Sequence, residues 1–286
     1  MDTRTTITLL VLLLGFLARA GLAQEVAKPA PEPRLRMTVR ADAEAVTPGS
    51  RFTLALSCKV DAGWHTYWPG LNDTGAPATI RLGLPAGWAA QPALWPAPTR
   101  SVAEGDLLDH VLEGEFAVLY DVQVPADAPA DGSYTLKVDA EWLVCKSVCV
   151  METTSGSLPM RVETKRRENA PGVQLVREAR SRLPVNTLPP ELRTTVRDNV
   201  LEITWKGATE LTFAPVLNDI SYPHLATEGE AKGESLRLNL SAPTPLSTPS
   251  PRVEGVITVH FGKDGPARSF WLSIPLAPPP DTKSPK

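Results

Sequence analysis

An alternation of large apolar side chains with small or polar ones runs from Phe52 to Val60. It constrains the fold more than any other feature of this sequence. Leu54, Leu56 and Cys58 share its apolar phase, which predicts a strand with one buried face because successive side chains of a strand point to opposite faces. The 286-residue chain also contains 29 prolines, roughly twice the average share. Proline favours turns and strand edges over helix interiors, so we expect an all-β protein.

Residues 35–163 repeat this pattern in about seven short segments separated by turn signals, which is typical of an antiparallel β-sandwich. The clearest segments are 35–39, 52–60, 79–84, 114–124, 134–144 and 157–162.

The next part of the sequence predicts a linker, a short helix and a second β-sandwich-like domain. Residues 164–184 begin with a polar run, and Pro171 then suits the first turn of a helix that Pro184 ends. Residues 185–277 again alternate in short segments, and residues 278–286 read as a disordered tail. The expected strands of this second domain are 192–197, 200–205, 210–214, 235–240, 252–261 and 268–276.

The first 23 residues read as an export signal. Arg4 precedes an apolar run from Thr6 to Leu17, and Gly21-Leu22-Ala23 fits a signal-peptidase site. An uncleaved membrane anchor is the alternative, although the run is short for a span of roughly 20 residues. Residues 24–34 form a flexible lead-in. We therefore expect a periplasmic protein, soluble after cleavage, in a compartment where disulfides persist.

Several function classes lack support in the sequence. The formal net charge of -3 gives no electrostatic case for nucleic-acid binding. The acidic residues are scattered, and we find no Ser/His/Asp arrangement and no phosphate-binding glycine loop. We predict neither a bound cofactor nor a metal.

Cys145 and Cys149 are the chief candidates for chemistry. Cysteines four apart in an extended strand would lie roughly 13 Å apart, whereas a disulfide needs Cα atoms within about 7 Å. If the two are bonded, the chain must turn sharply at residues 146–148, at the end of a strand. So small a loop adds little chain-entropy stabilisation, which favours an exchangeable bond, and the positive charge of Lys146 would favour a thiolate.

Other interpretations of this pair stay open at this point. The bond could be an inert local disulfide, or the two thiols could be reduced and buried. Two thiolates with Met151, His65 or His110 would suit Cu(I), but no Cys-x-x-Cys, His-rich or Met-rich cluster supports that. The third cysteine, Cys58, lies on the apolar phase of its strand and is expected to be a buried small hydrophobe.

Four segments, in order, resemble the N-terminal periplasmic domain of the DsbD thiol:disulfide interchange family, especially its longer, copper-tolerance-associated members. They are Gly63-Trp64-His65-Thr66-Tyr67-Trp68, Leu94-Trp95-Pro96-Ala97-Pro98-Thr99-Arg100, Leu112-Glu113-Gly114-Glu115 and Trp142-Leu143-Val144-Cys145-Lys146-Ser147-Val148-Cys149. The sequence lacks the membrane helices and the thioredoxin-like domain of that family.

The resemblance implies an immunoglobulin-like sandwich whose redox disulfide is Cys145–Cys149. In the family this domain takes electrons from a membrane-embedded reductase or thioredoxin-like donor and passes them to oxidised periplasmic proteins, a role linked to cytochrome c biogenesis and copper tolerance. It also implies that the donor attacks Cys149 and that an aromatic-bearing segment caps the disulfide, either residues 64–68 or the loop 102–110. Candidate tuning or capping residues are Lys146, His65, Tyr67, Trp68 and His110.

Two alternatives to a disulfide-reductase component are kept. The chain could be a non-catalytic periplasmic binding or assembly module that retains the fold, or a copper-handling protein. Whether it acts as an enzyme is left open by the sequence.

Overall fold

The computed structural model describes residues 32–241, 251–262 and 265–276. The predicted signal peptide, most of the lead-in, residues 242–250 and 263–264, and the predicted tail lie outside the described residues. From Pro33 onward the chain forms one compact unit. It is an all-β protein with an immunoglobulin-like fold, as predicted.

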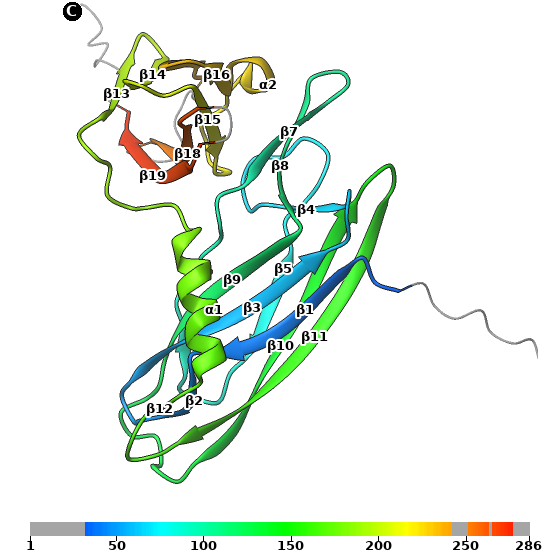
Figure 1. Cartoon of the computed structure of the whole chain (residues 1–286), viewed down its shortest axis with the longest axis vertical. Coiled ribbons are helices and arrows are strands. Elements are labelled where there is room, and N and C mark those ends of the chain that lie inside the picture. Colours follow the sequence, from blue (N-terminus) through cyan, green and yellow to red (C-terminus); the bar gives the residue numbers. More distant parts are fainter. Residues whose placement is uncertain (1–31, 242–250, 263–264, 277–286) are drawn as a thin grey trace, which may run out of the picture. The chain divides into compact units, whose positions relative to one another are not determined.

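The first β region is built from two sheets, which contain four and eight strands among the described residues. The smaller has the order β1-β3-β9-β6, and the larger has β12-β2-β11-β10-β4-β8-β7 with β5 also on β10 (Figure 1). The strands of the smaller sheet are β1 Leu35–Ala41, β3 Arg51–Val60, β6 Ala89–Ala90 and β9 Glu115–Gln123. Those of the larger are β2 Ala43–Val46, β4 His65–Tyr67, β5 Thr79–Gly83, β7 Thr99–Ala103, β8 Leu107–Glu113, β10 Ser133–Cys145, β11 Cys149–Val162 and β12 Arg167–Glu168.

The core of this region is formed by the apolar phase of the strands. Leu54 and Leu56 of β3 are fully buried with Leu136 and Trp142 of β10. Cys58 is buried on the same phase, as expected. The indole Nε1–H of Trp142 donates to Thr154 Oγ1 over 2.9 Å, so the largest core side chain keeps its polar atom paired.

Two segments differ from the expectation. Residues 102–110, expected as a loop, instead belong to a β7–β8 hairpin that turns at Gly105 and Asp106, both with positive φ. Strand β11 starts at Cys149, eight residues before the predicted start. Its first half is rich in Thr and Ser with one face in solvent, so the apolar alternation there is weak although β10 pairs with it throughout.

The predicted helix is α1, Ala170–Ser181, with Pro171 in its first turn. It buries Val176 and Ala179 against Ala55 and Leu119 of the smaller sheet. The helix ends at Ser181, a little before Pro184, which was expected to end it.

The second β region has sheets of three and four strands in the part that the structure describes, with orders β13-β14-β17 and β16-β15-β18-β19. Its strands are β13 Leu192–Arg197, β14 Val200–Trp205, β15 Glu210–Pro215, β16 Glu230–Lys232, β17 Ser235–Asn239, β18 Arg252–His260 and β19 Ala267–Pro275. Six of these match predicted strands within a residue at each end. The short helix α2, Leu225–Glu228, and β16 were not predicted.

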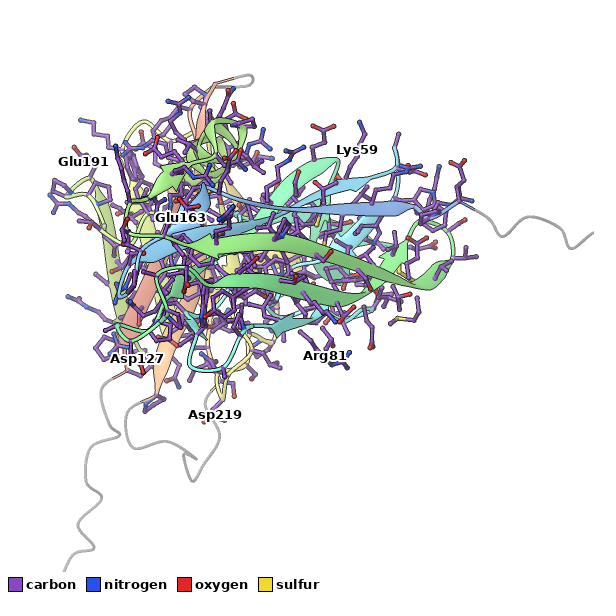
Figure 2. The ribbon with its side chains drawn as sticks, turned by 90° about the horizontal axis from the view of Figure 1, so that it is seen from below. Lys59, Arg81, Asp127, Glu163, Glu191 and Asp219 are labelled. Atoms are coloured by element: carbon purple, nitrogen blue, oxygen red, sulfur yellow. A yellow bond between two sulfur atoms is a disulfide. The ribbon has the colours of Figure 1, made fainter. Side chains whose placement is uncertain are left out.

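The surface of the first region carries exposed ion pairs across neighbouring strands. Lys59 pairs with Glu115 over 2.8 Å, and Arg81 pairs with Glu141 over 2.7 Å. Figure 2 shows Lys59 and Arg81 projecting outward from the ribbon. Exposed pairs of this kind add at most about 1 kcal/mol each, so the packed core is the main source of stability.

Candidate functional site

Cys145 and Cys149 form a disulfide that closes the tip of the β10–β11 hairpin. Their Cα atoms are 4.1 Å apart, and the turn is completed by a hydrogen bond from the Lys146 N–H to the Val148 carbonyl over 3.0 Å. The chain therefore turns at residues 146–148, as the spacing predicted. The bond lies at the end of a sheet, where other molecules can reach it.

The two cysteines are unequal in exposure. Cys145 is only 2% exposed, whereas Cys149 is exposed. This follows from their strands, because β10 has β4 on its other side at Cys145, with His65 directly opposite. A reagent in solvent thus meets the Cys149 side of the bond first.

The buried side of the disulfide packs on a small apolar cluster. Cys145 packs in one cluster with Tyr67 of β4, Val111 of β8 and the partly buried Leu143. The rings of His65 and Tyr67 are 5.4 Å apart in an edge-on arrangement. His65 and Tyr67 therefore lie on the disulfide side of β4, as strand alternation requires for residues two apart.

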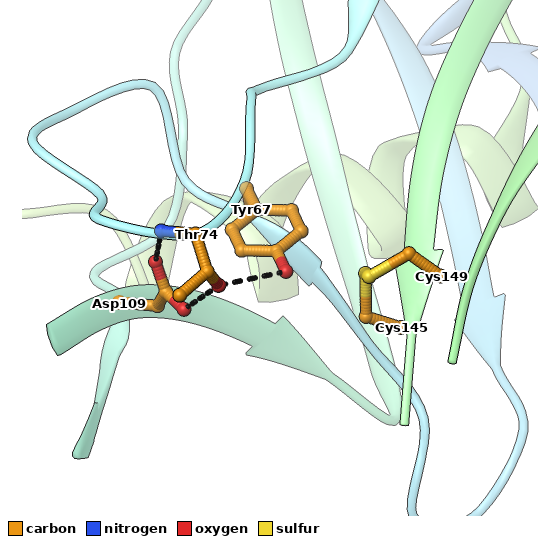
Figure 3. The surroundings of a disulfide bond; sticks show 5 residues. All are labelled: Tyr67, Thr74, Asp109, Cys145 and Cys149. Atoms are coloured by element: carbon orange, nitrogen blue, oxygen red, sulfur yellow. Dashed lines mark hydrogen bonds between the residues drawn. A yellow bond between two sulfur atoms is a disulfide. The ribbon is translucent and has the colours of Figure 1, made fainter. Parts of the chain in front are cut away.

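A chain of hydrogen bonds leads from the Tyr67 ring away from the disulfide (Figure 3). The Thr74 hydroxyl donates to Asp109 Oδ2, so its oxygen can accept from the Tyr67 hydroxyl, 3.5 Å away. The Thr74 N–H also donates to Asp109 Oδ1 over 3.0 Å. Burial raises the pKa of Tyr67, with the Asp109 charge adding to the effect. The phenol therefore stays protonated and acts as a hydrogen-bond donor at neutral pH.

Gly75 lets the chain pass directly over this ring. A Cβ built on Gly75 would lie 2.0 Å from the Tyr67 ring, so no larger residue fits without moving the tyrosine. The backbone at Gly75 thus packs directly against the Tyr67 ring.

Trp68, the residue after β4, and His110 of β8 face away from the disulfide. Trp68 is 2% exposed and belongs to the main core, with the His110 ring 6.4 Å from its own. His110 is 1% exposed, and its Nδ1 bonds the Leu71 carbonyl over 2.6 Å. Burial lowers the pKa of His110, so it is neutral and Nδ1 carries the donated hydrogen. The structure therefore brings His65 and Tyr67 to the disulfide and leaves Trp68 and His110 on the other side.

Lys146 lies in the exposed turn of the hairpin, and its side chain runs along Gly63, with Nζ 3.1 Å from where a Gly63 Cβ would be. Gly63 has a φ of +75°, a left-handed conformation that glycine adopts without strain. The 61–64 turn and the disulfide hairpin thus lie side by side.

Sequence reasoning missed Thr74 and Asp109. Asp109 is 8% exposed in the middle of the apolar run 107–112. A buried carboxylate in such a run needs a polar partner, and this was the available signal. Nothing in the sequence identified Thr74, 35 residues away, as that partner.

Membrane-spanning and metal-binding features were also sought. No helix within the described ranges is long and apolar enough to cross a membrane. The same ranges hold no group of three or more His, Cys, Asp and Glu side chains placed to bind a metal ion.

Comparison with solved structures gives a fold match. The N-terminal periplasmic domain of ScsB from Proteus mirabilis is 16% identical, with 87% of this chain and 97% of that chain covered and a TM-score of 0.56. The periplasmic chaperone SfaE (10% identity, 82% and 98% covered, TM-score 0.25) and the Escherichia coli chaperone DraB (11%, 83% and 99%, 0.23) match too distantly to support any argument. Comparison with curated protein sequences gave no match.

A family model supplies the sequence-level match. Residues 34–159 match the model described as thiol:disulfide interchange protein DsbD, N-terminal, and this range contains both bonded cysteines and Tyr67, Thr74 and Asp109. The predicted resemblance is confirmed for this part of the chain. Residues 34–159 therefore form a domain of the DsbD N-terminal type.

Proposed function

We propose that this protein is a thiol–disulfide exchange protein that passes electrons through Cys145–Cys149. The observation that carries the proposal is the unequal exposure of the two cysteine residues at the tip of a hairpin. An exposed disulfide in a five-residue segment can be attacked without unfolding of the core. The family match of residues 34–159 supports the same chemistry.

The exchange begins at the exposed sulfur. A donor thiolate attacks Cys149 Sγ, forms a mixed disulfide and displaces the Cys145 thiolate, which takes a proton from solvent. The donor's second thiolate then attacks the donor sulfur of the mixed disulfide and releases the Cys149 thiolate, which also takes a proton from solvent. The donor leaves as a disulfide, and this protein has gained two electrons, held as two thiols.

The reverse sequence delivers those electrons to an acceptor. The Cys149 thiolate attacks the acceptor's disulfide, and the Cys145 thiolate then attacks Cys149 and releases the reduced acceptor. Tyr67 packs against Cys145, and we assign to it and His65 the positioning of the resolving sulfur. Lys146 favours the thiolate form through its charge.

The partners and compartment form part of the proposal. A membrane-embedded reductase or a thioredoxin-like protein would supply electrons, and oxidised periplasmic proteins would receive them. The export signal predicted for residues 1–23 and the persistence of disulfides outside the cytoplasm support this placement. Links to cytochrome c biogenesis and copper tolerance rest on the family resemblance.

The first test is the equilibrium reduction potential of the pair, measured by alkylation and intact mass in glutathione buffers. A value of about -180 to -270 mV, the range of known exchange proteins, is expected. A value below about -300 mV marks a structural disulfide and would favour a non-catalytic binding module. A C58A variant, which lacks the buried third cysteine, serves as the control and should give the same potential.

A further inference from the structure

Strand β11 has an open edge that starts at the exposed cysteine. Among the described residues, β11 pairs with β10 along its whole length, but with β2 only at Arg161 and Val162. From Cys149 to Leu158 it has a strand on one side alone. Figure 1 shows β10 and β11 as two long neighbouring strands.

The register shows which backbone groups face that edge. Directly opposed residues in an antiparallel pair alternate between hydrogen-bonded pairs, with Cα atoms about 5.5 Å apart, and non-hydrogen-bonded pairs at about 4.5 Å. Cys145 and Cys149 are 4.1 Å apart, so theirs is a non-hydrogen-bonded pair. The N–H and C=O groups of Cys149 therefore point away from β10, as do those of every second residue after it: Met151, Thr153, Ser155 and Ser157.

This edge lacks the features that normally prevent strand addition. Folded proteins protect edge strands with lysines, prolines or bulges. From Cys149 to Ser157 the only charged residue is Glu152, and its carboxylate accepts the Arg34 and Leu35 N–H groups over 2.7 and 2.9 Å. The first proline is Pro159, and the β10–β11 register is unbroken.

The same edge offers apolar contacts near the sulfur. Val148, Val150 and Met151 are 61%, 41% and 62% exposed. Large apolar side chains exposed together mark interaction sites more often than single ones do. Deeper along the edge, the partly buried Met37 and Val39 of β1 lie beside Thr154 and Gly156.

We infer that the open edge of β11 from Cys149 to Ser157 binds its exchange partner by β-strand addition, and that the occupant is an extended, cysteine-bearing segment of that partner. The inference rests on the proposed function and specifies its recognition step. Backbone hydrogen bonds to the outward groups of Met151 and Thr153 would align the segment, with its sulfur beside Cys149. Main-chain pairing supplies affinity in this mode, and alternate side chains supply specificity.

The test compares three thiols that differ in their ability to add as a strand. One is a capped eight-residue peptide of alternating Val and Thr with one Cys and terminal lysines. The second has the same side chains but N-methyl groups on alternate amides, and the third is glutathione. The rate of mixed-disulfide formation with the oxidised protein is followed by rapid acid quench and intact mass.

Two variants isolate the edge. T153P removes one outward N–H and leaves the ladder to β10 intact, because proline is tolerated where the N–H faces away from the sheet. T153V keeps that N–H and changes only the exposed side chain. The unmodified peptide should react at least about tenfold faster than the methylated one with the wild type and T153V. This ratio should fall severalfold in T153P, which loses one of the outward N–H groups, with the glutathione rate unchanged in all three proteins.

Amide hydrogen exchange gives a second readout. In C145S joined to the unmodified peptide through Cys149, the amides of Met151, Thr153 and Ser155 should become protected. A wild-type rate ratio near one, or no added protection of these amides, would overturn strand addition while exchange itself stands. A protein that reacts with none of the three thiols would overturn the proposed function and this inference together.

Discussion

The first β region contains cysteines in two opposite settings. Cys58 lies mid-sheet on β3, is 2% exposed, and burial raises the pKa of its thiol to about 12. Cys149 lies at the end of a sheet, exposed and bonded to its neighbour across the hairpin. The same residue type is a small core hydrophobe in one place and a reactive group in the other. Position within the sheet, rather than residue type, thus decides the chemistry.

The largest effect should come from removing the exposed sulfur. C149S should abolish mixed-disulfide formation with glutathione, because the attacked atom is gone, whereas C58A should leave the rate within a factor of about two. Quenched reactions analysed by intact mass would measure both. Loss of exchange in C58A would contradict the contrast between the two settings.

The free thiol of Cys58 should react far more slowly than the free thiol of Cys149. A pKa of about 12 instead of 9.0 leaves roughly a thousandth of the ordinary thiolate at pH 8. In the reduced, folded protein, iodoacetamide should therefore modify Cys149 long before Cys58. Equal labelling rates, with folding verified by circular dichroism, would show that the core opens around Cys58.

Stability should fall at high pH because of the buried thiol. Its pKa is raised on folding, so the unfolded state loses its proton first, and the stabilisation present below pH 9 is lost as pH rises towards 12. The slope from this one group is at most about 1.4 kcal/mol per pH unit. Urea unfolding between pH 8 and 11 should show a smaller decline in C58A than in the wild type. Parallel curves would mean that Cys58 does not contribute.

Breaking the hydrogen-bond chain beside the disulfide should lower the free energy of unfolding by a moderate amount. T74V leaves the buried Tyr67 hydroxyl and Asp109 without the Thr74 hydroxyl, a loss of about 1–3 kcal/mol. T74S should restore most of it. Urea titration of the three proteins measures this, and a T74V variant as stable as the wild type would contradict a contribution of the Thr74 hydroxyl.

The smallest effect is expected from the exposed turn lysine. K146Q should slow the reaction with anionic glutathione by less than about threefold at low salt, and the difference should vanish at 1 M salt because exposed charges are screened. K137Q, an exposed lysine of β10 in mid-strand, is the matched control and should have no effect. A salt-independent change in K146Q would indicate a contact rather than a charge effect.

Much of the fold was accessible from the sequence. The two-residue period predicted β3, β9 and β10 closely, and Pro171 with Pro184 bounded the helix. The prediction was poorer where a strand is held by pairing with its neighbour and its own sequence does not alternate clearly. The polar first half of β11 and the β7–β8 hairpin are such cases. There the neighbouring strand fixes the structure, and a single segment does not reveal its neighbour.

The sequence by itself determined that the cysteines could bond only across a sharp turn at residues 146–148, because strand rise and disulfide geometry are local constraints. The tertiary structure alone decided which sulfur is exposed. It also placed His65 and Tyr67 at the bond, left Trp68 and His110 facing away from it, and joined Thr74 to Asp109 across 35 positions. These outcomes depend on which strands pair and in what register, and pairing is set by the burial of a whole sheet rather than by any one segment.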